Sequence, residues 1–130
     1  MKDKLKKENP FLYRAKALRR AFKKLGHSFT LEQVINMMNQ ASICEYCHKP
    51  IAPLDYSIDH KIPLNKGGTN DMSNLHLICI KCNKVKGDLT DEQFKDLMNY
   101  LADKPEVYDN LYKRLRMANY KFFYIKRKKS

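Results

Sequence analysis

Two pairs of cysteines have the most specific spacing in this chain. Cys44 and Cys47 form the first pair, and Cys79 and Cys82 form the second. A Cys-x2-Cys turn points two thiolates at one metal ion, and two such turns supply the four ligands of a closed tetrahedral site. Four soft thiolates favour zinc, and a site with no open position serves structure rather than catalysis. We therefore expect one structural Zn²⁺ per chain, bound by all four cysteines.

Other uses of these cysteines fit the sequence less well. Disulfides persist in oxidising compartments, but the N-terminus MKDKLKKENP lacks the apolar stretch of a secretory signal. No apolar run approaches the roughly 18 residues of a membrane span, so we expect a cytoplasmic protein with reduced thiols. A thioredoxin-like pair would need a βαβ context, which the sequence does not show. Four thiols fill the coordination shell, so we assign His48 and His76 to the surface or to packing.

An acid and a base stand side by side between the two cysteine pairs. Asp59 and His60 occupy the centre of YSIDHKIPL, whose apolar residues indicate a strand. A purely structural strand has no need of that pair. Neighbouring side chains in a strand point to opposite faces, so the two residues can serve one site only if the strand bends or twists there. The alternative is that both merely hydrogen-bond to nearby turns.

The elements that must position this pair lie between the cysteines. Residues 48–78 separate the two cysteine pairs. This gap is longer than the roughly 15–20 residues between the pairs of common zinc ribbons, so a folded unit must lie there. The pattern predicts a strand, a glycine-containing turn, a second strand and a short helix that a glycine ends, at residues 54–64, 65–70, 74–79 and 80–86.

The short helix carries two polar residues that could face the strands. Asn83 and Lys86 are three residues apart and therefore share one helical face. If the helix packs across both strands, Asn83 can reach Asp59 and His60.

Helices are predicted on both sides of this unit. Asn9-Pro10 is typical of a helix start, and the apolar stripe after it ends at Gly26. Thr30 and Thr90 each open a capping box, and Pro105 starts a further helix. The final YKFFYIKRKKS could be a docking strand or a tail on nucleic acid, and its aromatic residues could stack on bases or pack in the core: Tyr120, Phe122, Phe123 and Tyr124.

These elements predict one α+β domain over residues 1–130. It consists of a basic helical flank over 1–42, a zinc-stapled central module over 43–88, and a second helical flank with a basic aromatic tail over 89–130.

The net charge of +12 is concentrated at the two ends of the chain. Residues 1–29 carry ten bases and two acids, residues 113–130 carry eight bases and no acid, and residues 30–112 carry eight bases and twelve acids. A polyanion such as DNA or RNA is the expected partner, because each neutralised phosphate releases counterions. The alternative is solvated helix faces and a disordered tail. The candidate nucleic-acid contacts are Arg14, Arg19, Arg20, Lys23, Lys24, Lys61, Lys84, Lys113, Arg114, Arg116, Lys126 and Arg127.

Four motifs follow one another in the central residues: Asp59-His60, Gly67-Gly68, Asn74-Leu75 and the run Cys79-x2-Cys82-Asn83-x2-Lys86. In this order they resemble the HNH endonuclease family, with its ββα-metal (His-Me finger) fold. The resemblance covers residues 43–88, about a third of the chain, and is closest to the four-cysteine branch that zinc staples.

The resemblance implies a role for each matching residue. His60 would be the general base that takes a proton from the attacking water, and Asp59 and Asn83 would hold a catalytic divalent ion. Asn74 would tie the loop and orient His60, and Lys86 would contact the scissile phosphate. Many family members carry His where this chain has Asn83, and an Asp–Asn pair of oxygen ligands favours Mg²⁺ or Mn²⁺.

The resemblance therefore implies a metal-dependent endonuclease that hydrolyses phosphodiester bonds in DNA, by nicking or by double-strand cleavage. The expected substrate is double-stranded DNA, and two cuts would need a homodimer through the flanking helices or a second visit. The alternative is a non-catalytic, zinc-stapled nucleic-acid-binding module, which would need none of Asp59, His60 and Asn83. A zinc scaffold for proteins fits the net charge poorly.

Overall fold

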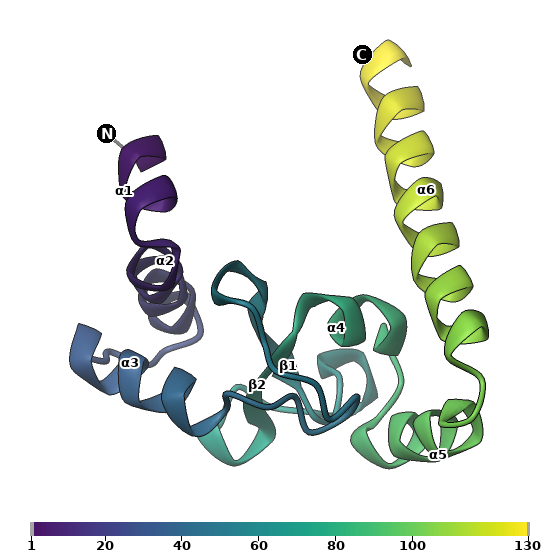
Figure 1. The fold of residues 1–130 in the computed structure, drawn as a ribbon, viewed down its shortest axis with the longest axis horizontal. Helices are drawn as coiled ribbons and strands as arrows, with labels where there is room; N and C mark the ends of the chain where they lie inside the picture. The colour runs from purple at the N-terminus through teal and green to yellow at the C-terminus, as the bar shows by residue number, and fades with distance from the viewer. Residues whose placement is uncertain (1, 130) are drawn as a thin grey trace.

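The computed structural model describes the backbone of residues 2–129 and the side chains of residues 3–118. A two-stranded sheet and one short helix lie at its centre, between three N-terminal and two C-terminal helices (Figure 1). This α+β arrangement confirms the predicted fold class. The helices and strands are α1 (Lys2–Glu8), α2 (Pro10–Lys24), α3 (Leu31–Gln40), β1 (Tyr56–His60), β2 (Leu75–Cys79), α4 (Ile80–Lys86), α5 (Asp91–Leu101) and α6 (Pro105–Lys129).

Three of the helices begin at side-chain caps that the sequence predicts. The Asn9 side chain accepts a 3.1 Å hydrogen bond from the first turn of α2. Thr30 and Gln33 exchange capping-box bonds of 3.1 and 2.8 Å, and Thr90 and Gln93 exchange bonds of 3.2 and 3.0 Å. These bonds satisfy amide groups that have no partner inside the helix, and each cap contributes about 1 kcal/mol.

The two strands pair antiparallel, and α4 packs across both of them. Tyr56 lies opposite Cys79, and Asp59 lies opposite His76. This register brings the second cysteine pair close to the first. It also sets a histidine directly across from the acid of the predicted site.

Strand β1 is shorter than the predicted strand over residues 54–64. Short 3₁₀ turns occupy Pro53–Asp55 and Leu64–Lys66 on either side of it. Proline has no amide hydrogen for a ladder, so Pro53 and Pro63 restrict regular pairing to the residues between them.

The loop after β1 needs both of its glycines. Gly67 has φ +89°, a left-handed conformation that side chains disfavour. A Cβ atom on Gly68 would lie only 1.8 Å from the carbonyl oxygen of Ile62. The backbone of this loop can therefore fold back tightly against the end of β1.

Helix α2 is fastened to the sheet as well as to α3. Its buried residues Ala15, Leu18 and Phe22 belong to the same core cluster as those of α3. Burying one large apolar side chain contributes about 1.5–3 kcal/mol. In addition, Nε of Arg14 donates a 2.7 Å hydrogen bond to the carbonyl oxygen of Tyr56 in β1. The first flank is thereby held against the strand that carries the Asp–His pair.

The end of the chain is helical. Of the two alternatives expected there, the docking strand is wrong, because α6 continues as helix to Lys129, and contact of a tail with nucleic acid stays a prediction. Neither Gly nor Pro follows Pro105, and Leu, Lys, Arg and Met favour helix. The predicted stacking and phosphate contacts at residues 120–127 involve side chains outside the described residues: Tyr120, Phe122, Phe123, Tyr124, Lys126 and Arg127. Helix α1 is also absent from the sequence prediction. Among the described residues, no helix has the length and apolar character needed to span a membrane.

Candidate active site and metal centre

The four cysteines converge on one point, as their spacing predicts. Their sulfur atoms all lie within 4.8 Å of one another, and Cys44 and Cys82 are buried. The first pair sits on a tight turn, closed by a 2.8 Å bond from the His48 amide to the Cys44 carbonyl, with His48 at φ +60°. Cys79 caps the N-terminus of α4 and accepts from the Cys82 amide at 3.3 Å. The first turn thus meets the start of α4.

The thiols oppose one another's ionisation. Hydrogen bonds from Cys79 and Cys82 hold the pKa of Cys44 far below its usual range. The same contact with Cys44 raises the pKa of Cys79 to about 12 and raises that of Cys82 further. One thiolate therefore forms readily while its neighbours are held protonated. All four thiolates can form together only when a cation offsets their charge. Four soft donors at this spacing fit zinc, which would serve a structural role here.

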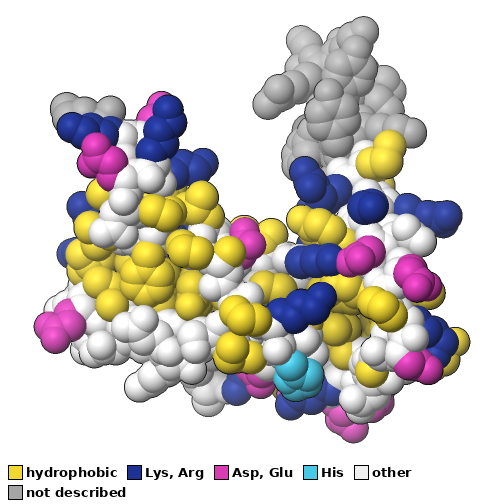
Figure 2. Space-filling model, viewed as in Figure 1, with side chains coloured by type: hydrophobic (Ala, Val, Ile, Leu, Met, Phe, Trp, Pro, Cys, Tyr) yellow, Lys and Arg dark blue, Asp and Glu magenta, His cyan; other side chains and the backbone are white. Residues whose placement is uncertain are grey.

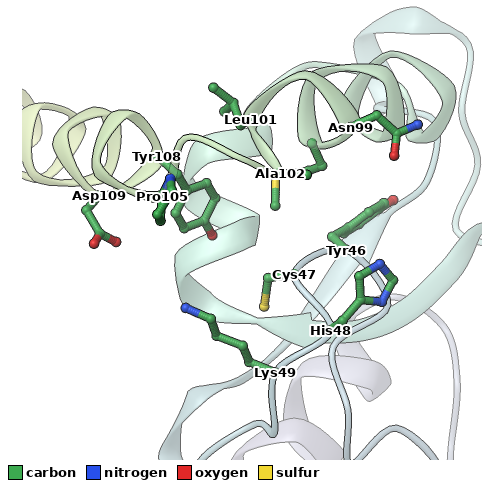
Figure 3. Close-up of a pocket in the computed structure, with 11 residues that line it drawn as sticks. Tyr46, Cys47, His48, Lys49, Asn99, Leu101, Ala102, Pro105, Tyr108 and Asp109 are labelled. Carbon is green, nitrogen blue, oxygen red and sulfur yellow. The ribbon is translucent and has the colours of Figure 1, made fainter.

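Helix α6 reaches the metal centre through one tyrosine. The hydroxyl of Tyr108 lies 3.0 Å from the sulfur of Cys82. Lys81, which precedes Cys82 on α4, pairs with Asp109, and its ammonium lies 4.8 Å from the centre of the Tyr108 ring. A pocket of about 250 Å³ lies between the first cysteine turn and the junction of α5 and α6 (Figure 3). Tyr46, Cys47 and Tyr108 line it, so the metal centre forms part of its wall.

The predicted acid, base and amide line one cavity at the end of β1. Asp59, His60 and Asn83 all border this space of about 360 Å³, together with residues of the following loop and the end of α4. His60 is the last residue of β1, where the chain leaves the sheet, so it can share a cavity with its neighbour Asp59. The structure therefore brings together Asp59 and His60, which strand alternation alone would separate, and adds Asn83 from α4.

Asp59 is buried and carries two strong partners. Only 4% of the residue is exposed. One carboxylate oxygen lies 3.2 Å from Nζ of Lys86, and the other lies 2.6 Å from Nε2 of His76. The Lys86 ammonium also donates a 2.9 Å bond to the carbonyl of His60, and its side chain has no exposed surface. A buried charge is tolerated because it is paired in this way.

His60 is oriented by the loop that follows it. Its Nε2 lies 2.7 Å from the side-chain oxygen of Asn70. The backbone carbonyl of Asn70 in turn lies 2.6 Å from Nε2 of His27, at the end of the first flank. Since the Asn70 oxygen can only accept, Nε2 of His60 carries the hydrogen. The lone pair of the neutral ring is then on Nδ1.

Asn74 closes that loop with three hydrogen bonds. Its amide nitrogen donates to the carbonyls of Ile62 and Thr69 at 2.9 and 2.8 Å, and its oxygen accepts from the Ile62 amide at 2.9 Å. These bonds bring the two ends of the loop together and so place Asn70 beside His60.

Asn83 faces β1 from α4, but it does not bond to Asp59 or His60. Its amide nitrogen donates to the hydroxyl of Ser57 at 3.1 Å and to the carbonyl of Ile58 at 3.2 Å. Because both bonds use the nitrogen, the amide oxygen of Asn83, a residue that lines the cavity, keeps its capacity as a hard acceptor.

Sequence reasoning missed the residues that hold the site in place. His76 was assigned to the surface or to packing, yet it bridges Asp59 and the Glu45 carboxylate of the first cysteine turn. Asn70 was read only as part of a turn. The strand register and the loop path create both contacts, and no local pattern carries that information. The one available signal for His76 was its position in the second predicted strand.

The predicted nucleic-acid contacts occupy different environments. Arg14 is engaged by β1, whereas the remaining basic residues of α2 are exposed. Lys61 and Lys84 are half-buried. The basic residues at the start of α6 are exposed, namely Lys113, Arg114 and Arg116. Figure 2 shows basic side chains around α1 and along α6 on one face, with hydrophobic side chains gathered over α2 and α3.

Residues 44–99 match the HNH endonuclease family model. The resemblance to this family is confirmed. The HNH segment, residues 44–99, begins at the first metal cysteine, contains β1, β2 and α4, and extends past the predicted boundary at residue 88 into α5. Tyr46 explains the extension, because its hydroxyl donates a 2.6 Å bond to Asp91 and its ring packs 4.7 Å from that of Phe94.

Part of the chain is also similar to part of a curated endonuclease. A stretch of 54 residues is 35% identical to the CRISPR-associated endonuclease Cas9 of Corynebacterium diphtheriae. The stretch is 41% of this chain and 5% of that protein. The chain thus spans a small fraction of the relative's length, and the similarity concerns one segment of each.

Proposed function

We propose that this chain is a metal-dependent endonuclease that hydrolyses phosphodiester bonds in DNA. One observation carries the proposal: Asp59, His60 and Asn83 line a single cavity inside the segment that matches HNH endonucleases. A strand that only supports the fold needs no acid, base and amide at one cavity.

His60 acts as the general base in this proposal. Its bond to Asn70 leaves the lone pair on Nδ1, and Nδ1 takes the proton from the water that attacks the phosphate. A neutral imidazole is the effective form of such a base near neutral pH. A base positioned in this way typically accelerates the reaction about 10²–10⁴-fold.

Asp59 and Asn83 would hold Mg²⁺ or Mn²⁺. Each carboxylate oxygen has more than one lone pair, so the bonds to His76 and Lys86 leave Asp59 able to bind an ion as well. Hard oxygen donors suit these metals better than zinc. When bound, the ion would stabilise negative charge on the phosphate and on the leaving 3′ oxygen.

Lys86 takes a different role from the one the resemblance implies. Its ammonium is fully buried and contacts Asp59 and the His60 carbonyl. Contact with the scissile phosphate would require it to leave both partners. We therefore assign Lys86 to positioning Asp59.

The basic flanks supply the affinity for DNA. Phosphate contacts position a duplex without reading its sequence. The exposed lysine and arginine side chains of α2 and α6 can therefore hold double-stranded DNA by its backbone. A single copy would nick one strand, and a double-strand break would need a homodimer or a second visit. A cytoplasmic setting belongs to the proposal, because reduced metal-binding thiols persist in a reducing compartment.

One observation favours the alternative, a nucleic-acid-binding module without catalysis. Asp59 is almost fully buried and ion-paired, as a purely structural acid would be. Cleavage of supercoiled plasmid distinguishes the two functions. Wild-type protein that keeps its zinc should nick the plasmid when Mg²⁺ or Mn²⁺ is added, and not in buffer freed of both ions. Asn83→Ala should lose this activity. An intact plasmid in both metals would favour the binding module.

A further inference from the structure

We propose that a groove on α2 is a second DNA-binding surface, which seats the phosphate backbone of duplex DNA outside the cleavage cavity. The choice of DNA rests on the proposed function. The groove measures about 360 Å³ and shares no residue with the cavity at the end of β1. It also lies outside the HNH segment. The basic groove is lined by Lys16, Arg19, Arg20, Lys23, Ser28 and Phe29.

The four basic residues form one stripe along the helix. Lys16, Arg19, Arg20 and Lys23 are spaced i, i+3, i+4 and i+7, which places them on a single face of α2. At about 1.5 Å per residue the stripe is roughly 10 Å long. One DNA strand presents a phosphate about every 3.4 Å along the axis, so a stripe of this length can contact more than one phosphate of the same strand.

These cations have no carboxylate partner among the described residues. All four are exposed, and none takes part in an ion pair. By contrast, four of the eight basic residues in the acidic middle of the chain pair with an Asp, namely Lys81, Lys86, Lys95 and Lys104. Like charges held together on one helix repel one another, and an anionic backbone would relieve that repulsion.

The far wall of the groove is fixed by aromatic packing. Phe29 meets the buried Phe22 edge to face at 5.3 Å and stacks on His27 at 5.8 Å. Ser28, next to it, adds a hydroxyl that can donate to a phosphate oxygen. A concave surface with a rigid wall and four cations fits a phosphate backbone better than a flat solvated helix face would.

The basic groove is also rigidly joined to the cleavage cavity. Arg14 bonds the carbonyl of Tyr56, the first residue of the strand that ends in Asp59 and His60. His27, which precedes the groove wall, contacts the Asn70 backbone, and the Asn70 side chain orients His60. DNA held in the basic groove would therefore have a fixed position relative to the general base.

Salt-dependent binding of a short DNA duplex tests the proposal. The full chain is titrated with labelled duplex, without Mg²⁺ or Mn²⁺, at several salt concentrations. Each lost phosphate contact lowers the slope of log affinity against log salt by about 0.9. Arg19→Ala with Arg20→Ala should therefore lower the slope by about 1.8 and weaken binding at least tenfold. The matched control, Lys6→Ala with Lys7→Ala, removes the same charge from two adjacent exposed positions on α1 and should change the slope by less than about 0.5.

Three outcomes would overturn the proposal. The first is equal loss of affinity and slope in the arginine and lysine double variants, which would indicate general attraction rather than a groove. The second is an RNA duplex of the same sequence competing more tightly than the DNA duplex. The third is an arginine variant that keeps its zinc and its thermal transition and still binds the duplex with the wild-type affinity and slope.

A small phosphodiester, bis(p-nitrophenyl) phosphate, separates this proposal from the proposed function. It carries a single phosphate, and the basic groove shares no residue with the cavity, so the arginine variant should cleave it at the wild-type rate. A slower rate would contradict independent roles for groove and cavity. A wild-type protein that binds duplex through the groove and cleaves neither substrate would support the groove and contradict the nuclease.

Discussion

Asp59 on β1 and His76 on β2 lie directly opposite each other in the sheet, with Nε2 of His76 2.6 Å from a carboxylate oxygen of Asp59. The other ring nitrogen of His76 contacts the carboxylate of Glu45, which lies between Cys44 and Cys47. His76 therefore connects the zinc turn to the acid of the cavity. In the proposed nuclease, where Asp59 holds the catalytic ion, His76 would orient that ligand from its other side.

Replacing His76 should lower the affinity of the cavity for the proposed catalytic ion more than it lowers the stability of the fold. We expect His76→Ala to raise the Mn²⁺ concentration that gives half-maximal cleavage by about 10–100-fold, because Asp59 loses the donor that orients it. His76→Gln keeps a donor and should restore part of the affinity. Plasmid cleavage across a Mn²⁺ titration measures both variants. An unchanged Mn²⁺ dependence in His76→Ala would show that the contact positions nothing.

Removing the Lys86 ammonium should destabilise the protein strongly. Lys86→Met leaves the Asp59 carboxylate buried without its cationic partner, which typically costs about 3–5 kcal/mol. Asp59→Asn in the same chain should recover much of that loss, because the unpaired charge is then gone. Urea unfolding of the zinc-loaded protein gives the free energies. Lys84→Met, on the same helix, should stay within about 0.5 kcal/mol of wild type, and an equal loss there would contradict the buried pair.

Asn70 should affect the rate and leave substrate binding unchanged. Asn70→Ala removes the acceptor that fixes the ring and tautomer of His60, so kcat should fall at least about tenfold while KM stays constant. Lys66→Ala is a control on the same loop and should cleave as wild type does. Steady-state cleavage of a labelled duplex separates the two parameters. A rise in KM alone would assign Asn70 to DNA contact instead.

Removing zinc should unfold the centre of the molecule. The four cysteines crowd around one point and cannot all ionise without a cation, so metal binding and folding are coupled. Metal analysis should find one zinc per chain, and Cys79→Ser should lose both the zinc and the cooperative thermal transition. A fully folded, metal-free protein would contradict the structural role.

The sequence predicts the parts of this structure that depend on local signals. The cysteine spacing, the capping boxes at Thr30 and Thr90, and the short helix ended by Gly87 each depend on a few neighbouring residues, and the structure confirms them. Such features can be read from the sequence because their physical cause lies within a few residues.

The sequence does not predict contacts between elements. The ends of β1, the pairing of His76 with Asp59, and the support of His60 by Asn70 depend on strand register and on how the loop folds back. Burial of Lys86 is likewise a tertiary result, since a lysine near the end of a helix would ordinarily be solvated. The path of α6 was missed because its aromatic residues suggested a strand.

Single-turnover cleavage of supercoiled plasmid by His60→Ala tests the central claim most directly. His48→Asn is the matched control, since it replaces an exposed histidine outside the cavity and asparagine tolerates the positive φ at that position. With Mg²⁺ or Mn²⁺ present, His48→Asn should cleave at the wild-type rate and His60→Ala at least about 100-fold more slowly. Cleavage by His60→Ala at the wild-type rate, in protein free of contaminating nuclease, would contradict the assignment of His60 as the general base.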